Sequence, residues 1–189
     1  MRITGGEARG RRILLPGGSR IRPTSDRIRE SLFGILGPLD GLSFLDLFAG
    51  SGAVGLEALS RGAGSSVFVE RQKRLADAIR RNLELLGFSK KGEILAAEAE
   101  RGLSRLAARQ ARFGILFADP PYDGGYVAKT LKWLERTDLL AEEGIVVLQH
   151  SLREGIDEAC PRTLKAVDRR RYGDTVLSFL KSQGVERSL

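Results

Sequence analysis

From Ser43 onward, short apolar segments alternate with amphipathic segments, and this alternation constrains the fold more than any other feature. We expect strands at residues 43–48, 65–70, 93–97, 114–118 and 145–149, separated by helices at 53–61, 72–86, 99–108 and 127–134. Strands that alternate with helices form a mostly parallel sheet with helices on both faces. Two more strand-like segments, 164–170 and 175–181, are joined by Tyr172-Gly-Asp174, which is typical of a hairpin. The sequence therefore predicts an α/β fold with a seven-stranded, mostly parallel sheet and an antiparallel last strand.

The first part of the chain has a different composition. Residues 1–22 are rich in Gly and Arg, and we interpret them as a small basic extension of a main domain at 23–189. Within the extension, Arg11–Leu15 has the character of a short strand before the turn at Pro16-Gly-Gly18. Pro23-Thr24 is expected to open a helix whose apolar stripe consists of Ile28, Leu32, Ile35 and Leu36.

The charge is concentrated in this first part. The chain carries a net charge of +7, with a pI near 10.0. Eight arginines against three acids in residues 1–30 contribute +5 of it (8 − 3). Guanidinium groups bind phosphate in a bidentate manner and stack on bases, so this distribution favours a nucleic-acid partner. A solvated basic arm without a ligand is the alternative.

Composition also excludes several classes of protein. No apolar run approaches the roughly 20 residues that cross a bilayer, and the first residues lack the apolar core of a signal peptide. A single cysteine, Cys160, and a single histidine, His150, leave no disulfide and no metal site to expect. We therefore expect a cytoplasmic protein without a membrane segment. Neither residue is expected to be catalytic: His150 is interpreted as structural or cleft-lining and Cys160 as a buried or incidental thiol.

A glycine pattern, Gly50-x-Gly52-x-x-Gly55, lies between the first strand and its helix. Such glycines let a backbone approach a ligand closely, and the helix N-terminus offers free N–H groups. A dinucleotide site is one interpretation, but Asp46 would oppose a pyrophosphate. A ligand with both an ammonium and a carboxylate group fits better, such as the methionine part of S-adenosylmethionine. A tight turn without a ligand is the third possibility.

A carboxylate, Glu70, ends the second strand, 15 residues after Gly55. In this position a carboxylate can accept both ribose hydroxyls of an adenosine. NAD and S-adenosylmethionine both contain that ribose, so Glu70 does not discriminate between them.

The most specific signal is Asp119-Pro-Pro-Tyr122, which ends the strand before it. An exocyclic base amine is a poor nucleophile, because its lone pair is delocalised into the ring. Asp119 and the carbonyl of Pro120 can accept its two hydrogens, and Tyr122 offers a surface on which an extruded base can stack. The motif therefore indicates methylation of a nucleobase amine, with a Pro-rich surface turn as the alternative.

These residues resemble the Rossmann-like class I methyltransferases in their cofactor loop, LDLFAGSGAVGLEALSRGA, and in DPPY, the signature of the amino-methylating branch. With GEARGRRILLP, RPTSDRIRESLFGIL and RRYGDTVLSFL, the match extends over nearly the whole chain and is similar to the RsmD family. Members of that family methylate the exocyclic N2 of one guanine in bacterial 16S ribosomal RNA. The resemblance implies S-adenosyl-L-methionine as cofactor and 16S rRNA, in the small subunit or an assembly intermediate, as partner. Because no long exposed apolar segment demands a protein partner, we expect a monomer.

The resemblance also implies site residues. Asp119, Pro120 and Tyr122 would hold the guanine. The implied cofactor-binding residues are Asp46, Phe48, Ala49, Gly50, Ser51, Gly52, Glu70, Arg71, Glu98 and Ala99, although Asp or Asn is more usual than Glu at position 98. The implied RNA-binding residues are Arg2, Arg9, Arg11, Arg12, Arg22, Thr24 and Arg27. Residues 22, 24 and 27 also fit a salt-bridged helix N-terminus.

Three other functions remain open from the residues. An adenine-N6 methyltransferase of DNA or RNA would use the same DPPY corner. An NAD-dependent oxidoreductase is disfavoured by Asp46 and by the lack of an evident proton relay. A non-catalytic RNA-binding protein would tolerate changes at Asp119, which is intact.

Overall fold

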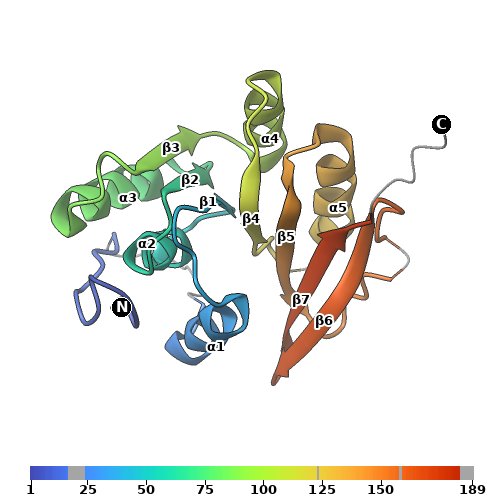
Figure 1. Ribbon diagram of the computed structural model, residues 1–189, viewed down its shortest axis with the longest axis horizontal. Helices are drawn as coiled ribbons and strands as arrows, with labels where there is room; N and C mark the ends of the chain where they lie inside the picture. The colour runs from blue at the N-terminus through green and yellow to red at the C-terminus, as the bar shows by residue number, and fades with distance from the viewer. Residues whose placement is uncertain (17–23, 123, 158, 184–189) are drawn as a thin grey trace. The chain divides into compact units, whose positions relative to one another are not determined.

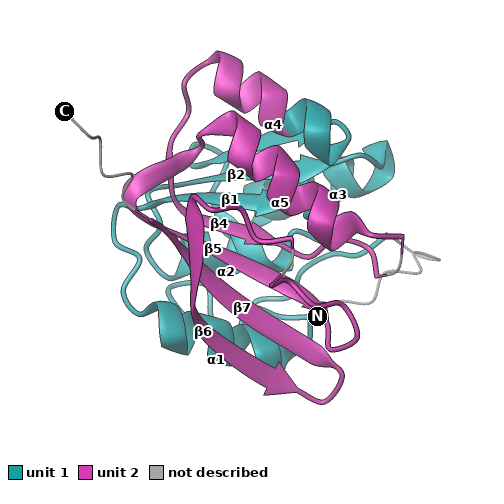
Figure 2. Ribbon diagram, turned by 90° about the vertical axis from the view of Figure 1, so that its right-hand side faces the viewer, with its two compact units in different colours: residues 1–102 teal, residues 103–189 magenta. Residues whose placement is uncertain are grey.

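Helices and strands alternate along the chain in the computed structural model, which describes residues 1–16, 24–122, 124–157 and 159–183 (Figure 1). The chain divides into two compact units, residues 1–102 and 103–189 (Figure 2). Within the described ranges, the first unit contains α1 (Asp26–Leu36), β1 (Ser43–Leu47), α2 (Ala53–Ser60), β2 (Ser65–Glu70), α3 (Lys73–Leu86) and β3 (Gly92–Ala96). Helix α4 (Ala99–Ala108) crosses the division, and the second unit contains β4 (Phe113–Ala118), α5 (Tyr126–Thr137), β5 (Leu140–Ser151), β6 (Leu164–Tyr172) and β7 (Thr175–Ser182).

In the first unit the strands lie in the order β3-β2-β1, and both pairs are parallel. Helix α2 packs on β1 and β2, and α3 packs on β2 and β3. The apolar stripe of α3 is buried, because residues three or four apart share one helix face. The helix ends at Gly87, whose φ of 83° is a conformation that glycine adopts without strain. The parallel strands bring Leu47, Glu70 and Ala96 to one edge of the sheet.

Helix α1 differs from the prediction in its start and in its buried face. It begins at Asp26, and the Ser25 hydroxyl accepts a hydrogen bond from the N–H of Ile28 as an N-cap. The expected stripe is wrong in part, because Ile35 is 38% exposed and Ile28 is only half-buried. The fully or nearly fully buried residues are Arg29, Leu32 and Phe33. Phe33 packs near Phe44 of β1, with ring centroids 6.4 Å apart.

The N-terminal segment, residues 1–16, packs on helices of the first unit. Ile3, Ala8 and Ile13 are buried. The backbone N–H of Ala8 donates to the Ser60 hydroxyl at the end of α2, and Asn82 of α3 exchanges two hydrogen bonds with the backbone of Leu14. The short strand expected at Arg11–Leu15 is reduced to a single antiparallel bridge between Arg2 and Arg12. The domain boundary expected between residues 22 and 23 lies outside the described residues and stays a prediction.

In the second unit the strands lie in the order β4-β5-β7-β6. β4 and β5 are parallel, whereas β7 runs antiparallel to both β5 and β6. The predicted hairpin and antiparallel last strand are therefore confirmed, with a turn at Gly173 where φ is 63°. β5 is longer than expected because Leu140 already pairs with Phe113, before an irregularity in the register. In the part of the chain that the structure describes, no helix has the length and apolar character needed to span a membrane.

Candidate active site

The turn that links β1 to α2 has an unusual backbone. Phe48, Gly50 and Gly52 all have positive φ angles, of 70°, 54° and 75°. Glycine adopts such angles readily, but for Phe48 the conformation costs of order 1 kcal/mol, which is typical of functional turns. A Cβ at Gly52 would lie 2.8 Å from Cγ1 of Ile79. The glycine pattern therefore serves a close approach of backbone to α3 as well as the turn itself.

Asp46 lies inside β1 with its side chain buried. Its Oδ2 accepts a hydrogen bond from the backbone N–H of Gly55 over 2.9 Å. The first N–H groups of a helix lack partners within the helix, and a carboxylate is favourable there. One oxygen of Asp46 is thus hydrogen-bonded to the N-terminal turn of α2. Contact with a ligand ammonium stays a prediction.

Glu70 lies at the edge where β2 ends and contacts the same turn. Its Oε2 accepts from Gly50 N–H over 2.8 Å, and its Oε1 accepts from Gln72 N–H over 2.7 Å. Burial raises the pKa of Glu70 above its usual value, and these backbone donors and the Arg71 charge oppose that shift. The structure therefore brings a buried carboxylate into direct contact with the glycine turn.

The end of β3 completes this group of residues in the first unit. The backbone N–H of Ala97 donates to the carbonyl of Glu70 over 3.1 Å. Next to it, Glu98 is exposed and lies 3.7 Å from the Arg71 guanidinium, whereas Ala99 is buried. An exposed ion pair of this kind contributes little to stability.

The Asp-Pro-Pro-Tyr corner follows β4 in the second unit. Oδ2 of Asp119 accepts a hydrogen bond from Nε2 of Gln149 over 2.9 Å. Pro120 is buried, and the Tyr122 hydroxyl lies 3.4 Å from Oγ1 of Thr175, the first residue of β7. The carboxylate is therefore oriented by β5 and the phenol by β7.

His150 follows Gln149 and points to the other face of the sheet, because successive side chains of a strand alternate. Its Nδ1–H donates to the carbonyl of Ser151, and Nε2 accepts from the Ser178 hydroxyl, both over 2.9 Å. Burial lowers the pKa of His150, so the neutral ring is favoured. Cys160 is half-buried, and burial raises the pKa of its thiol.

The proposed RNA-binding residues differ in their surroundings. Arg9, Arg12 and Arg27 are exposed, and so is Arg2, whose Nε lies 3.9 Å from Asp26. Arg11 is exposed too, but its guanidinium donates to the carbonyls of Leu85 and Leu86 at the end of α3. Thr24 is largely buried, and its carbonyl accepts from Arg29. Arg22 lies outside the described residues.

Comparisons with known proteins identify the family. The family model described as "Conserved hypothetical protein 95" matches residues 1–181. "Putative rRNA methyltransferase YlbH" of Bacillus subtilis is 35% identical over 185 residues, 97% of this chain and 100% of the relative. "Ribosomal RNA small subunit methyltransferase D" of Escherichia coli (strain K12) is 36% identical over 157 residues, 82% of this chain and 77% of the relative. The chain belongs to the RsmD family.

A solved structure supports the same assignment of this RsmD-family chain. The putative methyltransferase yhhF from Escherichia coli has a TM-score of 0.86 and 31% identity, and the match covers 97% of this chain and 98% of that one. The predicted fold class, a Rossmann-like α/β fold with a mostly parallel sheet and an antiparallel last strand, is confirmed. The RsmD-family chain is a methyltransferase.

Sequence reasoning missed two functional candidates of this RsmD-family protein. Gln149 received no role, although a polar residue at the end of a strand next to β4 was a usable signal. Arg29 was counted only as one of the basic residues, yet its side chain is completely buried against Glu57 of α2. No local pattern distinguishes a buried arginine from its exposed neighbours Arg27 and Glu30.

Proposed function

We propose that this protein transfers a methyl group from S-adenosylmethionine to the exocyclic N2 amine of a guanine in 16S rRNA of the small ribosomal subunit. The observation that carries the proposal is the Asp119–Gln149 hydrogen bond in the DPPY corner of an RsmD-family chain. The curated relatives with the name ribosomal RNA small subunit methyltransferase D support the substrate class.

The turn in the first unit fits the proposed cofactor. Its positive φ angles allow a close approach of the backbone to a ligand, and Glu70, which accepts from Gly50 N–H, offers a buried carboxylate for ribose hydroxyls. We assign the methionine part to Asp46, Phe48, Ala49, Gly50, Ser51 and Gly52, and the adenosine to Glu70, Arg71, Glu98 and Ala99. S-adenosylmethionine supplies an electrophilic methyl group. A fold neighbour with 15% identity, SMU.776, was solved in complex with SAH.

Asp119, Pro120 and Tyr122 would prepare the amine. The Asp119 carboxylate and the Pro120 carbonyl each accept one N–H of the guanine amine, so its lone pair points at the methyl donor. Tyr122 stacks on the extruded base, an interaction of about 1–3 kcal/mol per base. Because the amine becomes acidic as it forms the new N–C bond, Asp119 needs only to accept or pass on one proton. Most of the acceleration then comes from orientation.

The basic residues would bind the RNA backbone. Arg2, Arg9, Arg12 and Arg27 expose their side chains to phosphates, and Arg22 is proposed with them. We propose that Arg11 and Thr24 contribute chiefly by supporting that surface, since both are hydrogen-bonded within the first unit. Binding through phosphates releases counterions and weakens steeply with salt. A substrate of this kind places the enzyme in the cytoplasm, where we expect it to act as a monomer.

The test is transfer of a tritiated methyl group to small ribosomal subunits from a strain that lacks the enzyme, followed by nucleoside analysis. We expect the label in N2-methylguanosine. Label in N6-methyladenosine would favour the adenine methyltransferase, and no label in rRNA would refute the proposal.

The matched variant is Asp119→Ala, which should lose transfer while it retains its affinity for the RNA. A variant that still transfers methyl groups would exclude the proposed role of Asp119.

A further inference from the structure

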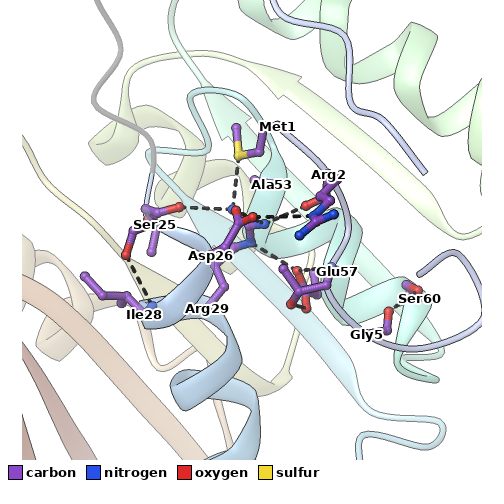
Figure 3. A network of polar contacts seen from close by, with 12 residues as sticks. Met1, Arg2, Gly5, Ser25, Asp26, Ile28, Arg29, Ala53, Glu57 and Ser60 are labelled. Carbon is purple, nitrogen blue, oxygen red and sulfur yellow. Dashed lines mark hydrogen bonds and ion pairs between the residues drawn. The ribbon is translucent and has the colours of Figure 1, made fainter. Parts of the chain in front are cut away.

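A fully buried arginine, Arg29, lies at the centre of a network in the first unit (Figure 3). Its guanidinium has five N–H groups, and the structure provides a partner for each. The acceptors are Glu57 Oε2 (3.0 Å), Thr24 O (3.0 Å), Met1 Sδ (3.0 Å), Arg2 O (2.6 Å) and Asp26 Oδ1 (3.0 Å).

Glu57 of α2 is equally buried and shares its two oxygens between three residues. Oε2 accepts from Arg29 and from the backbone N–H of Thr4 over 3.2 Å. Oε1 accepts from the Thr4 hydroxyl. It also accepts from the guanidinium of Arg61, whose Nη2 lies 2.9 Å away. The pair Arg29–Glu57 therefore joins α1 and α2 to residues 1–4.

The backbone groups in this network belong to the proposed RNA-binding surface. Arg29 holds the carbonyl of Arg2, whose own side chain is 71% exposed. It also holds the carbonyl of Thr24, next to the N-cap of the helix that carries Arg27. Glu57 lies on the helix that begins directly after the glycine turn. One buried side chain thus connects the segments next to Arg2 and Arg27 to the helix of the cofactor turn.

A buried ion pair is a poor device for stability alone, because desolvation of two charges offsets much of their attraction. Apolar residues of similar volume would hold α1 on α2 at least as well. They could not bind the carbonyls of Arg2 and Thr24, which lie on two separate segments. The arginine is therefore suited to fix the positions of those segments, since its planar fork presents donors in defined directions.

We propose that Arg29 is a positioning residue that holds residues 1–4 and 24–26 on α2 in the arrangement that binds ribosomal RNA. This inference rests on the function proposed above. Without Arg29, the exposed arginines remain in the chain but lose their fixed spacing, so fewer of them meet phosphates at one time.

The test uses the double variant Arg29→Met/Glu57→Gln, which removes the two fully buried charges together. Arg61, whose side chain is 25% exposed, loses a charged partner but can still donate to the new amide oxygen. We expect the KM for small ribosomal subunits to rise at least about tenfold, while kcat and the Kd for S-adenosylmethionine change less than about threefold. A rise in KM at constant kcat reports lost substrate binding. The slope of log KM against log salt should also become shallower, since it counts the phosphate contacts.

The matched control is Arg112→Met/Asp138→Asn, which removes an exposed pair of the same charges in the second unit, 2.7 Å apart. It should leave KM and the salt slope unchanged. If the first variant does not fold, Arg29→Lys decides the question, because an ammonium keeps the charge but offers at most three donors. An unchanged KM and salt slope in the folded variant would overturn the proposal. Absence of transfer by the wild-type protein would instead refute the proposed function.

Discussion

Gln149 donates a hydrogen bond from its side-chain nitrogen to Oδ2 of Asp119 over 2.9 Å. Gln149 is buried on β5, and Asp119 follows the parallel neighbour β4. The amide therefore fixes the orientation of the carboxylate that we propose to bind the guanine amine.

Replacement of this amide should impair catalysis. A hydrogen bond to a charged group contributes about 1.5–3 kcal/mol, which corresponds to roughly 10–100-fold in rate. We therefore expect Gln149→Leu to lower kcat/KM for small subunits by that factor, with the Kd for S-adenosylmethionine unchanged. Thr175→Val removes only the 3.4 Å contact with the Tyr122 hydroxyl and should cost less than threefold. Full activity of Gln149→Leu would show that Asp119 needs no such orientation.

Two helical glycines should respond to the same substitution with opposite signs. A Cβ at Gly55 of α2 would lie 2.4 Å from Cε1 of Phe68 and 2.8 Å from Oγ of Ser66, whereas a Cβ at Gly34 of α1 meets no atom within 4 Å. We expect Gly55→Ala to lower the free energy of unfolding by about 1–3 kcal/mol and Gly34→Ala to raise it by up to about 1 kcal/mol. Urea denaturation measures both. Equal effects would contradict the close approach of α2 to β2.

The protonation of Glu70 should appear in the pH dependence of cofactor binding. Its pKa is raised mainly by burial, so the folded protein takes up a proton at a higher pH than an ordinary glutamate. Protonated Glu70 thus contributes fully to the stability of the folded protein below pH 4.5, which is the ordinary pKa of a glutamate. This contribution is lost as the pH rises through the raised pKa of Glu70.

Affinity for S-adenosylmethionine should show the reverse trend, because ribose hydroxyls need the ionised carboxylate as acceptor. We expect the Kd, measured by calorimetry between about pH 4.5 and 7.5, to increase as the pH falls through the raised pKa. Glu70→Gln should bind more weakly and lose this dependence. A wild-type Kd that is constant over the range would argue against the contact with the ribose.

His150 should make stability sensitive to mild acid. Its pKa is lowered chiefly by burial, so the folded state favours the neutral ring. The stability that it contributes is full above the ordinary pKa of 6.5 and is lost as the pH falls through the lowered value. The free energy of unfolding in urea should therefore be constant above the ordinary pKa of 6.5 and drop as the pH falls from there through the lowered pKa. His150→Gln should flatten this drop, and an equally steep profile in that variant would assign the acid sensitivity to other groups.

Features that depend on neighbouring residues in the chain could be predicted from the sequence. The stripe of α3 follows helical spacing within the predicted helix at 72–86, and Leu75, Ile79, Leu83 and Leu86 are buried. The turn at Gly173 and the antiparallel β7 follow from hairpin chemistry. The succession of strands and helices along the chain, the glycine turn and the Asp-Pro-Pro-Tyr corner were likewise predicted, since each depends on a few consecutive residues, whereas the order of the strands in the sheet was not predicted.

Features that depend on distant partners required the tertiary structure. Arg29 is buried because Glu57, 28 residues later, and the carbonyls of Arg2 and Thr24 meet it there. Arg11 binds the end of α3, over 70 residues away, and Gln149 meets Asp119 across 30 residues. The spacing of apolar side chains along the chain determines, through local geometry, which segments form helices or strands and which of their faces are buried. The burial of a charge or an amide depends on acceptors and donors that only the folded chain brings within hydrogen-bonding distance.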